Sequence, residues 1–141
     1  MKKVLISIAT LIFLFTSIYA LDFFNDNGAD GTLTIQLIDE IGDTVFIEEY
    51  DFINEDTLFS ILSEEHFVGC ADSSFNVTSN CESNMFTSRV ILKIDDIETD
   101  WTNSYFAIYV NDTYSLAGID SVNLNNDDVI SFEYKLVGGD D

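Results

Sequence analysis

Few residues of this 141-residue chain could carry out catalysis. His66 is the single histidine, so a Ser-His-Asp triad would have to include it. It follows Glu64 and Glu65 near the end of a predicted helix, has no nucleophile motif nearby, and is interpreted as a surface residue. Two of the 26 acidic residues could act as general acid and base, but no pair stands out. We therefore predict a protein that is not an enzyme.

Cys70 and Cys81 are the only cysteines and flank the polar stretch 71–80. Two cysteines and one histidine do not supply the four ligands of a zinc finger. In an exported chain such a pair predicts a disulfide that closes the intervening loop, with free thiols as the alternative.

Aromatic residues gather in the C-terminal third of the chain, where they could form a platform for a ligand. The candidate ligand-binding residues, with one asparagine that follows an aromatic segment, are Trp101, Tyr105, Phe106, Tyr109, Asn111 and Tyr114. The alternatives are that the rings pack in the core and that the asparagine shapes a turn.

The formal net charge of −21 makes nucleic acid and anionic lipid poor partners. Asp127 and Asp128 are weak candidates for calcium ligands, and the alternative is a solvated acidic surface. The residues themselves predict no cofactor.

The N-terminal segment has the composition of a targeting signal. Lys2 and Lys3 precede an apolar run over 4–18, and Ala20 is a small residue suited to a cleavage site. This pattern predicts a signal peptide over 1–20, followed by a flexible leader over 21–31. The protein is then expected to be secreted or displayed at the cell surface, and to contact a membrane only through an uncleaved signal segment.

Alternating and β-branched residues predict strands near 32–37, 44–50, 90–94, 105–110 and 130–136. A helix is predicted from Asp56 or Thr57, with Leu58, Ile61 and Leu62 on one face and Gly69 as its stop. Residues 69–88 are polar and predict a long loop. One helix between runs of strands indicates an α+β fold with the helix on one sheet face.

The tract from Trp101 onward resembles a bacterial exported domain related to the C-terminal β-domain of transcobalamin and intrinsic factor. The residues that carry the resemblance are Trp101, the run Tyr105-Phe106-Ala107-Ile108-Tyr109-Val110-Asn111-Asp112, Gly118, and the run Leu124 to Tyr134. The corresponding domain would cover 32–137 and leave a tail over 138–141.

This resemblance implies a β-grasp-like fold, a small mixed sheet with one helix packed on it. It also implies a binding role, with a corrinoid such as cobalamin as a ligand, and with a small molecule or another exported protein as partner. The alternative function is a structural, acidic surface protein that binds divalent cations or a basic protein.

Overall fold

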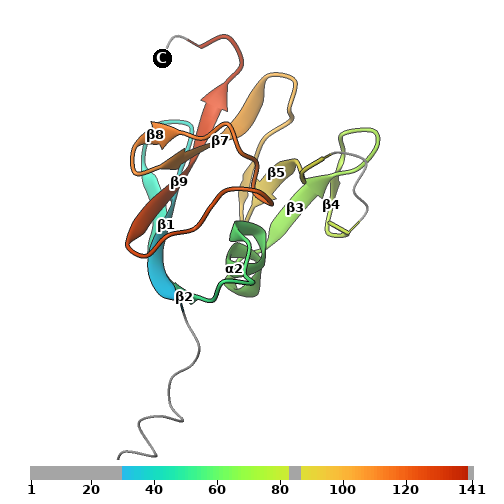
Figure 1. Ribbon diagram of the computed structural model, residues 1–141. Coiled ribbons are helices and arrows are strands. Elements are labelled where there is room, and N and C mark those ends of the chain that lie inside the picture. The colour runs from blue at the N-terminus through green and yellow to red at the C-terminus, as the bar shows by residue number, and fades with distance from the viewer. Residues whose placement is uncertain (1–29, 83–86, 140–141) are drawn as a thin grey trace, which may run out of the picture.

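The computed structural model describes residues 30–82 and 87–139 (Figure 1). The predicted signal peptide, most of the predicted leader and the last two residues of the predicted tail lie outside these ranges. The elements in chain order are β1 (Gly31–Ile38), β2 (Thr44–Phe52), α2 (Leu58–Glu65), β3 (Val68–Ala71), β4 (Val77–Thr78), β5 (Ile91–Ile94), β6 (Ile97–Glu98), β7 (Ser104–Val110), β8 (Thr113–Tyr114) and β9 (Asp128–Leu136). The fold is α+β. No described helix is long and apolar enough to cross a membrane.

The larger sheet has five strands in the order β2-β1-β9-β7-β8. The central pair, β1 and β9, runs parallel, and the other neighbours are antiparallel. Cross-strand register places Leu37 opposite Phe132, and Phe132 opposite Ile108, so these side chains share one face. Leu33, Ile35 and Leu37 alternate with more exposed residues and are at most 1% exposed, as their spacing predicts.

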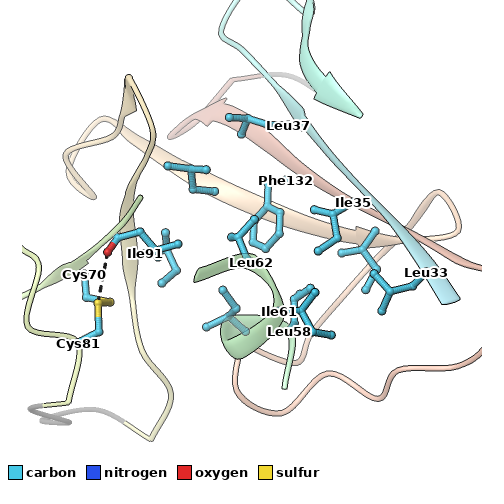
Figure 2. Close-up of a cluster of buried hydrophobic side chains, with 14 of the residues drawn as sticks. Leu33, Ile35, Leu37, Leu58, Ile61, Leu62, Cys70, Cys81, Ile91 and Phe132 are labelled. Carbon is cyan, nitrogen blue, oxygen red and sulfur yellow. Dashed lines mark hydrogen bonds between the residues drawn. A yellow bond between two sulfur atoms is a disulfide. The ribbon is translucent and has the colours of Figure 1, made fainter. Parts of the chain in front are cut away.

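The helix α2 covers this apolar face. Thr57 caps its first turn, because the Thr57 side chain accepts from the Ser60 N–H while the Ser60 hydroxyl accepts from the Thr57 N–H. Leu58, Ile61 and Leu62 point inward, and Figure 2 shows them grouped around Phe132. The predicted apolar face of the helix is confirmed.

The predicted helix stop is wrong. The helix ends at Glu65, and Gly69 lies in β3. A Cβ atom added to Gly69 would lie 2.6 Å from Val77 Cγ1, so a glycine is needed there for close packing of β3 against β4.

A second sheet, in the order β4-β3-β5-β6, occupies part of the region predicted to be a loop. The prediction of one small sheet was therefore incomplete, because β3 and β4 together contain only six residues and are too short to show a periodic pattern. The predicted disulfide between Cys70 and Cys81 is present. Both cysteines join the apolar cluster that the two sheets and α2 share (Figure 2).

The strand near 90–94 departs from simple alternation. In β5, Ile91 pairs with Cys70 and Lys93 pairs with Gly69, so Leu92 is an extra residue without a partner on β3. Its carbonyl instead accepts from the Thr99 N–H. This bulge leaves Ile91 and Leu92 both buried, which a strict period of two does not predict.

Candidate functional site

A cavity of about 250 Å³ lies between β7, the segment that leads into β5, and the segment that follows β8. Most of its lining side chains are apolar, and its charged lining residue is Arg89. The lining residues are Ser88, Arg89, Val90, Ile91, Trp101, Tyr105, Phe106, Ile108, Tyr114, Ser115, Leu116, Ala117, Gly118, Ile119 and Phe132. An apolar cavity of this kind suits an apolar group of a ligand.

Three large side chains around the cavity remain in contact with solvent. Trp101 is 46% exposed, Tyr114 is 51% exposed and Leu116 is 96% exposed. Single exposed apolar residues are normal on protein surfaces, but a group around a hollow is typical of an interaction site.

Trp101 is held in an unusual backbone conformation. Its φ angle is +62°, in the left-handed region that bulky residues rarely adopt. Its ring stacks on the ring of Phe75, with centroids 6.3 Å apart, and Phe75 has a φ angle of +59°. Backbone strain of this type is retained where the surrounding structure holds it in place, and it is common at binding sites.

A carboxylate holds the turn of Phe75. Asp72 Oδ1 accepts from the N–H groups of Ser74 and Asn76, at 2.8 and 2.9 Å. The bonds from the backbone of Asn76 and then Ser74 lower the pKa of Asp72.

Asp100 holds the turn of Trp101 in the same way. Its Oδ1 accepts from the N–H groups of Thr102, Asn103 and Ser104, at 3.0, 2.7 and 3.1 Å. The side-chain and backbone bonds from Asn103 lower the pKa of Asp100 to about 2. Two anionic turns thus present the stacked aromatic pair.

Arg89 lines the cavity, and its charge is paired. Its guanidinium forms an ion pair with Asp120, its Nε donates to the Cys81 carbonyl at 2.8 Å, and it lies 4.2 Å from the centroid of the Phe59 ring. The backbone N–H of Arg89 also donates to Asp120, at 2.7 Å. Arg89 therefore joins two segments of the cavity wall, and its charge is already balanced by Asp120.

The other basic residues of the described ranges are also paired. Lys93 lies 3.2 Å from a carboxylate oxygen of Glu98, and Lys135 lies 3.0 Å from one of Glu133. Within residues 30–82 and 87–139 the chain consequently offers no unpaired cation to a ligand.

The cavity brings together four of the predicted ligand-binding residues, namely Trp101, Tyr105, Phe106 and Tyr114. Tyr109 does not line it. The Tyr109 ring meets the edge of the Tyr114 ring at 5.7 Å, and the Lys135 ammonium lies 5.6 Å from its centroid.

Asn111 and Asp128 form a turn anchor and do not reach the cavity. Asn111 donates from Nδ2 to Asp128 at 2.8 Å and accepts from the Val129 N–H at 2.9 Å. Asp128 is 6% exposed and also accepts from the N–H of Asn125. Asp127 is exposed, with a φ angle of +65°. No group of three or more His, Cys, Asp or Glu residues in the described part of the chain could hold a metal ion.

The interpretation of His66 as a surface residue is wrong. Its side chain is 9% exposed, its Nδ1 lies 2.6 Å from Asp95 Oδ2, and its Nε2 lies 2.8 Å from the Tyr50 hydroxyl. The Tyr50 hydroxyl donates to Glu48 at 2.7 Å, and the His66 ring stacks on Phe46 at 4.0 Å. The sequence carries no sign of this cluster, because its members come from β2, the end of α2 and the turn after β5.

Phe75 is the aromatic residue that sequence reasoning missed. It lies in the polar stretch between the two cysteines, and a lone aromatic residue inside a loop closed by a disulfide was the available signal.

Comparison with known proteins assigns the chain to a domain family. Residues 55–135 match the domain of unknown function DUF4430, and the chain belongs to that family. The structure is similar to a crystal structure of a protein from Ruminococcus gnavus ATCC 29149 that is described as a proposed metal binding protein. The TM-score is 0.56 and the identity 14%, over 76% of this chain and 98% of that chain. At this identity the likeness shows the fold alone. No curated protein matches the sequence.

Proposed function

We propose that this protein is an exported, non-enzymatic binding module that takes an apolar or aromatic group of its ligand into the cavity beside β7. The observation that carries the proposal is the meeting of Trp101, Tyr105, Phe106 and Tyr114 around one apolar hollow. The left-handed backbone of Trp101 supports it, because it places a large ring at that hollow at the cost of strain.

Export is supported by the N-terminal sequence pattern and by the disulfide. Disulfides persist in oxidising compartments such as the outside of the cell.

We propose a non-enzymatic role because the partly buried polar cluster around His66 has a structural explanation. Burial, and then the hydrogen bond to Glu48, raise the pKa of Tyr50, so its hydroxyl stays protonated and is a poor nucleophile. His66 lies between Tyr50 and Asp95 and joins β2 to the end of α2, which is a structural task.

We extend the proposal to a β-grasp fold related to the transcobalamin β-domain. The sheet order β2-β1-β9-β7-β8, the parallel central pair and the single helix on one face support it. A corrinoid is then a candidate ligand. The cavity lies below the range of about 300–1,000 Å³ that is typical of sites enclosing a whole small molecule. A corrinoid would accordingly insert one ring-sized group and leave the rest outside.

The single tryptophan supplies the test. Cobalamin and the ring-sized probe benzimidazole are titrated separately into the protein. The emission of Trp101 and the absorbance of cobalamin are recorded. We expect quenching of Trp101 that saturates. A Tyr114→Ala variant should bind more weakly, and a Tyr134→Ala variant, on the same sheet but outside the cavity lining, should bind like the parent. No change with either probe at high micromolar protein would contradict the proposal.

A further inference from the structure

The outer edge of β7 is only partly covered. β8 pairs with Tyr109 and Val110 alone, and the Ser115 N–H adds one bond to the Ile108 carbonyl at 2.8 Å. Backbone groups of alternate residues face opposite edges of a strand. The bond from Ser115 therefore shows that Ser104, Phe106 and Ile108 direct their backbone groups outward.

Hydrogen bonds at both ends of β7 agree with this orientation. Asn103 and Asn111 direct their backbone groups to the β9 side, where Asn103 accepts from Val137 and Asn111 donates to Val129. On the outer side, the Ser104 N–H donates to the Asp100 carboxylate.

The middle of this edge is unpaired, although β5 lies close to β7. No described residue forms a hydrogen bond with the outward N–H or C=O of Phe106 or with the N–H of Ile108. Unpaired strand edges are templates for the addition of another strand.

The open edge adjoins the cavity. Phe106 and Ile108 both line the hollow, and a residue placed directly opposite Phe106 on an added strand would direct its side chain to the same face. One residue of a ligand could then form main-chain hydrogen bonds with Phe106 and place its side chain in the cavity. This is how peptides are recognised by strand addition.

The charges indicate what kind of strand would fit. β7 itself carries no charged residue, while Asp100 precedes it and Asp112 follows it, both exposed. The chain has a net charge of −21, and the basic residues of its described ranges are all paired. A neutral core flanked by basic residues is complementary to this edge.

We propose that β7 accepts an extended, basic segment of a partner protein as an added strand, with one apolar side chain of that segment in the cavity. This inference rests on the proposed function, since it identifies a peptide side chain as a group that enters the cavity.

The test uses four acetylated and amidated pentapeptides, Lys-Thr-X-Thr-Lys, in which X is Leu, Phe, Tyr or Trp. Each is titrated into the ¹⁵N-labelled chain, and amide shifts and amide hydrogen exchange are followed. We expect at least one peptide to shift Phe106 and Ile108 and to slow exchange of the Phe106 amide.

Three altered peptides separate the contributions of the main-chain hydrogen bond, the side chain X and the lysine charges to binding. Methylation of the backbone nitrogen of X should weaken binding about three- to tenfold, the value of one hydrogen bond. Replacement of X by Ala should weaken it about 10- to 100-fold, because the cavity stays unfilled. Replacement of both Lys residues by Glu should weaken it most at low salt.

A matched pair of protein variants tests the location. Leu116→Gln, which alters the cavity rim, should weaken binding, whereas Ile41→Gln, at another highly exposed position in the β1–β2 turn, should leave it unchanged.

Free indole, the size of one side chain, distinguishes the failure of the two proposals. If indole shifts the cavity amides but no peptide binds more tightly than indole, strand addition is wrong and the cavity remains a binding site. If neither indole nor any peptide shifts these amides, both proposals are wrong. Shifts confined to β2 would also overturn the inference.

Discussion

The two edges of the five-stranded sheet differ in length, charge and cover. β2 forms one edge with nine residues, exposes Ile47 at 61%, and carries Glu48, Glu49 and Asp51. β7 and the two-residue β8 form the other edge, where residues 104–110 are uncharged and adjoin the aromatic cavity.

Charged side chains on an edge strand prevent unwanted pairing with other chains. The acidic residues of β2 fit that role, and their absence from β7 fits the proposal that this edge accepts a partner. Acidic residues therefore have different roles at the two edges. Exposed carboxylates lie along β2, whereas Asp72 and Asp100 accept hydrogen bonds in the turns that hold Phe75 and Trp101 near the other edge.

The largest expected effect concerns Phe132, which is 0% exposed and lies under the cavity. Phe132→Ala should lower the free energy of unfolding by about 3–5 kcal/mol, because it leaves a void in the core. Urea denaturation followed by circular dichroism measures it, with the half-exposed Val129→Ala on the same strand as control. A cost below about 1 kcal/mol would show that the β7 side of the sheet is not packed as described.

Loss of the disulfide should have the next largest effect. The double variant Cys70→Ala, Cys81→Ala should lower the free energy of unfolding by about 3 kcal/mol, as expected for an eleven-residue loop. Because this loop carries Phe75, the emission of Trp101 should change as well. Unchanged emission in the folded variant would mean that the loop does not hold the aromatic pair.

The contribution of Asp100 should depend on pH. Its pKa is lowered from 3.8 to about 2 in the folded chain, so its stabilising effect is complete above about pH 4 and is lost as the pH falls toward 2. Asp100→Asn should therefore be less stable than the parent at pH 6, and the difference should shrink as the pH falls through about 2. Asp112→Asn removes the same charge without this turn anchor, and an equal convergence there would contradict the assignment.

The smallest effect on stability is expected at the β2 edge. Glu49→Gln with Asp51→Asn should change the free energy of unfolding by less than about 0.5 kcal/mol, since both side chains are exposed. Self-association should nevertheless increase, measured by light scattering after size-exclusion chromatography. The charge-matched control is Glu55→Gln with Glu64→Gln, away from the edge. Equal self-association of both double variants would mean that net charge alone, and not the charges on the β2 edge, prevents association between copies of the chain.

Much of the fold followed from local patterns. The alternation around Leu33 and Ile130 predicted their strands, the spacing of Leu58 and Leu62 predicted the helix, and the cysteine pair predicted the disulfide. The second sheet did not follow, because its strands are short and β5 contains a bulge at Leu92.

Of the candidate site, the aromatic residue types were predictable but their arrangement was not. Tyr109 and Tyr105 are neighbours in the same alternation on β7, yet only Tyr105 reaches the cavity. Asn111 was predicted to bind a ligand and Asp128 to bind a metal, but the two side chains form a hydrogen bond with each other.

By itself, the sequence determined the longer strands, the helix, the covalent cross-link and the strongly acidic character, since each depends on residue type and near neighbours. The tertiary structure alone decided that Phe75 meets Trp101, that the His66 side chain is largely covered and that the middle of the β7 edge is unpaired. These depend on strand order and register between segments far apart in the chain, which no local pattern encodes.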